Sequence, residues 1–380
     1  MGRSSDLSSA GLALVVGLAL GIACAACADP VPSATWTAAL AKATAQGLSG
    51  EIGLTDRTGT LSRTALSAPG HPHRVGEVWR WASVTKQITA TLVLQEVAAG
   101  HLGLDDRLAS RLPGFSGPTA GQITVRMLLQ HTSGLPNPDD TPTDAAQGLP
   151  SFYTRTAPSA SGSGTARVAS PDAFGYCAGP AKAAAGAGFS YNNCDYIVLG
   201  ALLEAATGQR FADLVRTRIT RPLGLGTLSL ADGTTDPATM VRGRLDATHP
   251  EPSFTLATFG ASGALLGDPA DLMAFDRALL NGRLLGPVET GLAWTGDPAL
   301  GYEALGTWAF PARLKGCAGP VRLVERRGGI GGVEVRNLIA PDIGRALVVF
   351  ADRSDLDFGE IWQGRGVSFD LASAGFCHGS

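Results

Sequence analysis

The chain has 380 residues, of which 44% are apolar and 17% are charged, and its formal net charge is −3 at pH 7. This length suffices for one large two-lobed domain or two small ones, and the composition supports a sizeable core and excludes global disorder. Basic residues do not cluster into a run, so the sequence predicts no nucleic-acid partner.

The N-terminal 28 residues have the pattern of a signal peptide. An apolar run covers Leu12–Ala23, and Ala26-Cys27-Ala28 places small residues where a signal peptidase reads them. We therefore expect cleavage before Asp29 and a secreted, periplasmic or otherwise extracytoplasmic protein. The run is short for a bilayer span, so we expect no stable membrane span after cleavage. The alternatives are an uncleaved membrane anchor and a lipid anchor on Cys24 or Cys27.

The first half of the mature chain contains three kinds of predicted segment. An Ala-rich helix is expected over Ser33–Gln46, and strands are expected over Glu51–Leu54 and Val75–Trp81. Ser83–Ala99 is apolar on nearly every side, which predicts a helix in the middle of a core. Asn137–Gly188 is rich in Pro, Ser, Thr, Gly and Ala, and is expected to be a long loop with short helices.

Three further helices are expected after this loop. They cover Tyr196–Ala206, Phe211–Ile219 and Ala270–Leu280. Asp268 stands ahead of Pro269 at the start of the third, which predicts an N-cap followed by proline in the first turn.

Strands dominate the last third. Arg322–Glu325 leads into a glycine cluster at 328–332, and a hairpin is expected from Val333–Ile339 and Ala346–Ala351 around the turn 341–344. With strands at both ends and helices between them, the sequence predicts an α/β (α+β) fold. We expect an antiparallel sheet built from both chain ends, flanked by helices, with an inserted helical lobe.

These elements predict one domain over residues 29–380. Its sheet lobe is expected at about 35–82 and 256–377, and its helical lobe at about 83–255.

The first cluster of residues that could carry out catalysis is Ser83-Val84-Thr85-Lys86. Residues three apart share a helix face, so Lys86 can reach the Ser83 hydroxyl. A serine becomes a nucleophile when a neighbour takes its proton. A lysine in a dry core and near a helix N-terminus loses its own proton more easily, so Lys86 is the candidate base.

The second cluster is Tyr191-Asn192-Asn193, directly before an apolar helix. The phenol of Tyr191 can relay a proton between nucleophile and leaving group. The amide of Asn193 can donate to a substrate carbonyl and hold the lysine. The alternative is an asparagine that only caps the following helix.

The third cluster is Arg326-Arg327-Gly328-Gly329, on a predicted strand. Glycines let a substrate backbone lie close to the strand, and a backbone N–H there can form an oxyanion hole with the N–H of Ser83. An adjacent arginine can bind a substrate carboxylate, so Arg326, Arg327 and Gly328 are candidate substrate-binding residues.

Four cysteines lie beyond Asp29: Cys177, Cys194, Cys317 and Cys377. An even number in an exported protein permits two disulfides, with three possible connectivities. We favour Cys177 with Cys194 and Cys317 with Cys377, because the first pair is close in sequence. Their spacing matches no metal site, and no metal or cofactor is predicted.

In this order, the clusters resemble the serine β-lactamase and penicillin-binding-protein superfamily, in the branch of class C β-lactamases, D-Ala-D-Ala carboxypeptidases and related esterases. Further similar stretches are Trp81–Gln87, Gly103–Asp106, Leu128–Leu135, Arg221–Leu225 and Gly263–Leu280. The resemblance covers roughly residues 35 to 355 and implies a β-lactamase/transpeptidase-like fold.

The resemblance implies that Ser83 is the nucleophile, Lys86 its base, and Tyr191 and Asn193 the Tyr-x-Asn element. It also implies that His131, within one of these stretches, is structural. No Gly-x-Ser-x-Gly elbow is present, which argues against an α/β-hydrolase.

The third family element, usually Lys-Thr-Gly or His-x-Gly, differs here. The spacing to the glycine cluster puts Arg326 at the Lys or His position and the oxyanion amide at Gly329. A shift by one residue would put Arg327 there and the amide at Ile330. Arginine keeps a positive charge but cannot act as a neutral acid or base, which argues against efficient β-lactam hydrolysis.

The predicted function is therefore a secreted serine hydrolase that forms an acyl-enzyme on Ser83. Its substrate is expected to be a D-alanyl peptide, a β-lactam or a small ester. The alternative is a penicillin- or peptidoglycan-binding domain with impaired turnover, which the altered third element suggests.

Overall fold

The computed structural model describes residues 33–154, 171–231 and 239–377. The predicted signal peptide lies outside the described residues. The helices are α1 Ala34–Ala45, α2 Thr85–Ala98, α3 Leu108–Arg111, α4 Val125–Leu129, α5 Ser151–Thr154, α6 Pro171–Cys177, α7 Asn193–Thr207, α8 Phe211–Val215, α9 Arg221–Leu223, α10 Pro269–Leu280, α11 Pro287–Ala293 and α12 Val367–Cys377. The strands are β1 Gly50–Asp56, β2 Thr60–Leu66, β3 Trp79–Arg80, β4 Thr143–Asp144, β5 Leu149–Pro150, β6 Ser229–Leu230, β7 Leu265–Gly267, β8 Trp308–Ala312, β9 Val321–Ile330, β10 Val333–Ala340 and β11 Arg345–Ala351.

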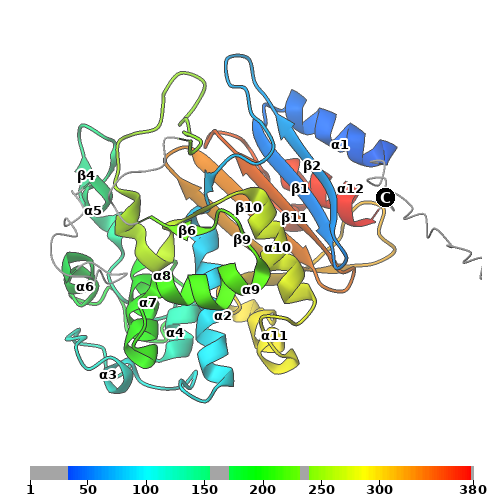
Figure 1. The fold of residues 1–380 in the computed structure, drawn as a ribbon. Helices are drawn as coiled ribbons and strands as arrows, with labels where there is room; N and C mark the ends of the chain where they lie inside the picture. Colours follow the sequence, from blue (N-terminus) through cyan, green and yellow to red (C-terminus); the bar gives the residue numbers. More distant parts are fainter. Residues whose placement is uncertain (1–32, 155–170, 232–238, 378–380) are drawn as a thin grey trace, which may run out of the picture.

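A six-stranded antiparallel sheet joins the two ends of the chain. Its order is β2-β1-β11-β10-β9-β8, and β1 pairs with β11 so that Gly50 lies opposite Ala351. The predicted hairpin is confirmed as β10 and β11. The predicted α+β class with an antiparallel sheet from both chain ends is also confirmed (Figure 1).

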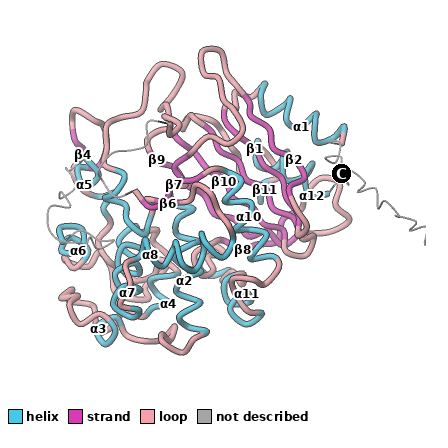
Figure 2. The backbone as a smooth tube through the Cα atoms, in the orientation of Figure 1, coloured by secondary structure: helices cyan, strands magenta, loops and turns pink. Residues whose placement is uncertain are grey.

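Helices cover both faces of this sheet. One face packs against α1 and α12 in a core that includes Trp36, Leu338 and Leu371. The other face packs against α10, and its core continues into the helices of the inserted lobe. Most of the short helices gather on the far side of α2 from the sheet, as Figure 2 shows by colour. Among the described residues, no helix is both long and apolar enough to cross a membrane.

The structure confirms a predicted helix cap, a predicted helix and both favoured disulfides. The Asp268 carboxylate accepts the N–H of Ala270 at 2.6 Å and caps α10, as predicted. The helix predicted from Ser83 to Ala99 is confirmed as α2 preceded by a 3₁₀ turn, Ala82–Val84. Both favoured disulfides, Cys177–Cys194 and Cys317–Cys377, are present.

Two element predictions were wrong in extent. The strand predicted over Val75–Trp81 is only β3, in a three-stranded sheet with β7 and β6, because the chain turns at Gly76 with φ of 91°. The helix predicted over Phe211–Ile219 ends as α8 at Val215 and continues as a π-helical turn. The strand β2 was not predicted.

Candidate active site

Ser83 stands on a constrained turn between β3 and α2. Ala82 has φ of 48° and is fully buried, a conformation that residues other than glycine rarely adopt. The turn is anchored on both sides, because the N–H of Trp81 donates to the Leu265 carbonyl at 2.9 Å and the N–H of Leu265 donates to Thr85 Oγ1 at 3.2 Å. The surrounding packing therefore determines where the Ser83 hydroxyl lies.

Two side chains contact that hydroxyl. Lys86 Nζ donates to Ser83 Oγ at 3.0 Å, and Tyr191 Oη lies 2.6 Å from the same oxygen. Lys86 Nζ also donates to Asn193 Oδ1 at 2.7 Å and to the Ser262 carbonyl at 2.8 Å. The structure therefore brings the first two predicted clusters together around one oxygen.

The protonation states of these groups follow from burial. Burial, reinforced by the charge of Arg326, holds the pKa of Lys86 well below its ordinary value. Burial raises the pKa of Tyr191, against the opposing charge of Arg326 and the hydrogen bond from Ser83. Lys86 is thus suited to take the proton of Ser83, and Tyr191 keeps a proton that it can donate.

The second cluster combines a cap and a contact residue. Asn192 is the N-cap of α7, since its side chain accepts the N–H of Cys194 at 2.8 Å. Asn193 is the first residue of the helix, and its amide contacts Lys86. The capping alternative thus applies to Asn192, whereas Asn193 lies in the site.

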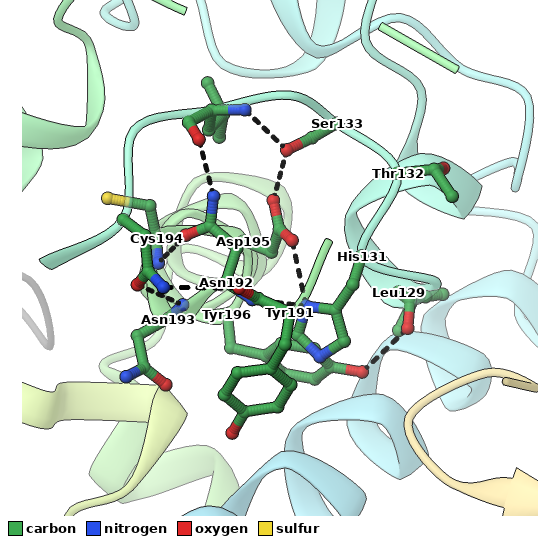
Figure 3. Close-up of polar contacts among 12 residues, drawn as sticks. Leu129, His131, Thr132, Ser133, Tyr191, Asn192, Asn193, Cys194, Asp195 and Tyr196 are labelled. Carbon is green, nitrogen blue, oxygen red and sulfur yellow. Dashed lines mark hydrogen bonds and ion pairs between the residues drawn. The ribbon is translucent and has the colours of Figure 1, made fainter. Parts of the chain in front are cut away.

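His131 supports this segment and does not contact Ser83 in any hydrogen bond found in the described structure. Its carbonyl accepts the N–H of Ser190, and its Nδ1 accepts the N–H of Asn192 at 3.2 Å and lies 2.9 Å from Asp195 Oδ2 (Figure 3). Its ring lies 4.6 Å from that of Tyr191. The geometry agrees with a structural role for His131.

The third cluster reaches the site through Arg326, which is buried. Its Nε donates to the Ser83 carbonyl at 3.1 Å, and its Nη2 donates to Tyr191 Oη at 3.2 Å. The side chain of Arg327 projects from the opposite face of β9 and binds Glu325 and Glu360. Because side chains alternate along a strand, only one of the two arginines can face Ser83, and here it is Arg326.

Gly328 lies directly against the nucleophile turn. A Cβ at this position would come within 2.7 Å of the Trp81 carbonyl oxygen and 3.0 Å of the Ser83 nitrogen. Both contacts are with backbone, which cannot move aside as a flexible side chain can. The position therefore requires glycine for this close approach.

The amide of Gly329 faces the open edge of β9. A two-residue turn, Gly331-Gly332, joins β9 and β10, and in such hairpins the flanking residues exchange their hydrogen bonds. N–H directions alternate along a strand, so the N–H of Gly329 points away from β10. The pairing of β9 with β8 ends at Glu325, so this amide lies on the side of β9 where the described residues provide no paired strand.

Several residues of the site were not predicted from the sequence. Asn193 Nδ2 donates to Tyr153 Oη at 2.8 Å and to Asp139 Oδ1 at 3.2 Å, and both partners come from the loop-rich stretch. Glu303 is fully buried, and its Oε1 lies 3.8 Å from Arg326 Nη1. Neither Glu303 oxygen has a hydrogen-bond partner among the described residues. No local pattern in the sequence marks these positions.

Comparison with known families agrees with this geometry. The family model described as Beta-lactamase matches residues 41–363, which confirms the resemblance inferred from the motifs.

Two curated relatives are similar over part of the chain. "Penicillin-binding protein 4" of Amycolatopsis lactamdurans is 31% identical over 256 residues, covering 62% of this chain and 60% of the relative. "Esterase EstB" of Burkholderia gladioli is 34% identical over 160 residues, covering 41% of this chain and 39% of the relative. The matches thus span less than two thirds of each relative's length.

A solved structure is similar over a larger share. The D-stereospecific amidohydrolase from a Streptomyces species is 25% identical, with a TM-score of 0.69 over 90% of this chain and 98% of that chain.

Proposed function

Because this chain belongs to the beta-lactamase family, we propose that it is a serine hydrolase that cleaves an amide or an ester through an acyl-enzyme on Ser83. The observation that carries the proposal is the position of Ser83 Oγ, within hydrogen-bond distance of both Lys86 Nζ and Tyr191 Oη. A base and a proton donor on one hydroxyl are what acyl transfer through serine requires.

Acylation begins when Ser83 Oγ attacks the substrate carbonyl carbon and its proton passes to Lys86 Nζ. The N–H groups of Ser83 and Gly329 stabilise the oxyanion of the tetrahedral intermediate. Collapse breaks the bond to the leaving group, which takes a proton from Tyr191, and Tyr191 recovers one from Lys86. Asn193 holds Lys86 in place throughout.

Deacylation completes the reaction. Water attacks the acyl carbonyl, the acid is released and Ser83 regains its proton. Arg326 keeps a fixed positive charge beside Tyr191 and orients the Tyr191 hydroxyl through a hydrogen bond.

Small esters and D-amino-acid amides or peptides are the proposed substrate classes. Support comes from a curated relative called an esterase and a structural neighbour called a D-stereospecific amidohydrolase.

The test compares the mature protein with Ser83→Ala on benzylpenicillin, a D-Ala-D-Ala peptide and p-nitrophenyl acetate. Intact mass and product are read together. We expect Ser83→Ala to remove essentially all turnover and every covalent adduct. Turnover retained by Ser83→Ala would exclude the assignment of the nucleophile.

The same experiment separates the second candidate function, a binding domain with impaired turnover, which the arginine in the third element favours. A Ser83-dependent adduct that forms once and does not turn over would support this binder. Several turnovers per molecule on any of the three compounds would support the hydrolase.

We also propose that the protein acts outside the cytoplasm. The signal pattern before Asp29 and the two disulfides support export, since disulfides persist in oxidising compartments. N-terminal sequencing of the exported protein should begin at Asp29, whereas a lipidated cysteine would show an anchored form.

A further inference from the structure

Asp139 is an exposed residue at the edge of the active site. Its Oδ1 accepts a hydrogen bond from Asn193 Nδ2 at 3.2 Å, and Asn193 Oδ1 accepts one from Lys86 Nζ at 2.7 Å. Lys86 Nζ also donates to Ser83 Oγ at 3.0 Å. A short chain of hydrogen bonds therefore connects this carboxylate to the nucleophile.

A buried asparagine, Asn137, fixes Asp139 relative to the catalytic residues. Asn137 Nδ2 donates to the Tyr191 carbonyl at 3.2 Å, and its Oδ1 accepts the N–H of Asn193 at 3.2 Å. The same Oδ1 accepts the N–H of Asp139 at 3.4 Å. On its other side, Asp139 Oδ1 accepts a hydrogen bond from Tyr153 Oη at 2.6 Å. The carboxylate thus has a fixed place beside the site, as a specificity contact requires.

No ion pair among the described residues includes Asp139. The adjacent carboxylate, Asp140, does form an ion pair, with Lys182. Burial and the positive charge of Arg326 hold the pKa of Lys86 well below its ordinary value, although the charge of Asp139 opposes them. Asp139 is therefore a negative charge beside a lysine that acts as a neutral base, and a positively charged substrate group could pair with it.

The charges of the site favour a substrate cation on the acyl side of the scissile bond. The leaving group takes its proton from Tyr191, and Arg326 Nη2 donates to the same Tyr191 Oη at 3.2 Å. The guanidinium beside the leaving group would repel an ammonium group there. Asp139 instead connects to Asn193 and Lys86, so a cation on the acyl portion would meet a charge of opposite sign.

We propose that Asp139 is a specificity-determining residue that binds an ammonium group on the acyl portion of the substrate, such as the α-ammonium of a D-amino acid. The inference rests on the proposed serine-hydrolase function and narrows its substrates. The ammonium donates to Asp139 Oδ2, whose hydrogen bond among the described residues is a 3.4 Å contact from Asn193 Nδ2. Amides and esters of amino acids with a free amino group are therefore preferred over the same compounds with an acylated amino group.

The test uses two p-nitroanilides whose acyl groups have the same shape, D-alanine p-nitroanilide and 2-methylpropanoyl p-nitroanilide. An ammonium group in the first takes the place of a methyl group in the second, and at pH 7 this amine is mostly protonated. The ammonium also activates the carbonyl, so the readout is the change that a variant causes in the ratio of the two kcat/KM values. An effect of the variant on the catalytic groups themselves cancels in this ratio.

Asp139→Asn removes the charge and keeps the size of the side chain and an acceptor oxygen for Tyr153 Oη. We expect it to lower the ratio about tenfold or more, because the ammonium loses its charged partner. Asp140→Asn is the matched control, since it neutralises the adjacent exposed carboxylate, which pairs with Lys182, and it should leave the ratio unchanged. A ratio that Asp139→Asn does not change, or that both variants lower equally, would overturn the proposal.

A binding measurement separates failure of this proposal from failure of the proposed function. Calorimetric titration of Ser83→Ala with the same two p-nitroanilides requires no turnover. Tighter binding of the D-alanine compound, weakened when Asp139→Asn is added, would support the contact with Asp139 even if the wild type hydrolyses neither compound. Equal binding of the two compounds, or no binding at millimolar concentration, would overturn it.

Discussion

In this buried site, burial and the charges of neighbouring groups shift the pKa values of single residues. Lys86 and Arg326 are both buried, and burial together with the positive charge of Arg326 lowers the pKa of Lys86. Glu303 is the buried carboxyl beside Arg326. Burial raises its pKa to about 8, against the opposing charges of Arg326 and Lys86. The other titratable groups around these three include Asp139, His131, Tyr191, Asp195 and Tyr196.

Glu303 should therefore shape the pH dependence of activity. Below pH 8 its carboxyl is protonated, so Glu303→Gln should behave like the wild type. Above pH 8 the wild-type carboxylate stabilises the ammonium form of Lys86, so fewer molecules have a neutral base. We expect the ratio of wild-type to variant kcat/KM to fall as the pH rises from 7 to 9.

The measurement is the pH profile of kcat/KM for p-nitrophenyl acetate. Asp276→Asn is the matched control, because Asp276 is also a buried carboxyl with a raised pKa but contacts Asn337 instead of the site cations. A ratio that stays constant across this range for Glu303→Gln would contradict the prediction.

The two disulfides connect different elements. Cys177–Cys194 ties the end of α6 to the second residue of α7, next to Asn193, and closes a separation of 17 residues. Cys317–Cys377 ties the segment between β8 and β9 to the end of α12 and closes a separation of 60 residues. Because α12 packs on the face of the sheet away from Ser83, the second bond is remote from the chemistry.

Removing one disulfide or the other should therefore affect different properties of the protein. Loss of Cys317–Cys377 by paired Cys→Ser changes should lower the free energy of unfolding more, by about 4 kcal/mol against about 3 kcal/mol for the shorter loop. Loss of Cys177–Cys194 should lower kcat/KM more, because it loosens the start of α7. Urea unfolding and ester hydrolysis test this, and a greater loss of kcat/KM from the Cys317–Cys377 pair would contradict it.

At the scale of the whole molecule, one core spans the sheet and the inserted helices. It contains Val84 and Ile88 around α2 together with Val335 and Val348 of the sheet. The nucleophile lies at this junction, with Lys86 on α2 and Arg326 on β9. Its geometry therefore depends on both parts being folded at once.

We accordingly expect residues 29–380 to unfold as a single domain. Far-UV circular dichroism and tryptophan fluorescence should report the same midpoint in urea, because neither part can leave the shared core without exposing it. Two separated transitions would show that the sheet and the helical insertion are independent units.

The sequence by itself determined the features that depend on neighbours along the chain. Ser83 and Lys86 meet because they are three residues apart at the start of a helix, and Asp268 caps α10 for a similarly local reason. The β10–β11 hairpin follows from its turn, and the family resemblance follows from short motifs in order.

Only the tertiary structure decided the rest. The alternation of side chains on β9 placed Arg326, and not Arg327, against Tyr191, and the pairing of that strand directed the Gly329 amide. Glu303 comes beside Arg326 because the segment before β8 meets β9. A side chain's burial and partners depend on segments far away in the chain, so no local pattern could have revealed them.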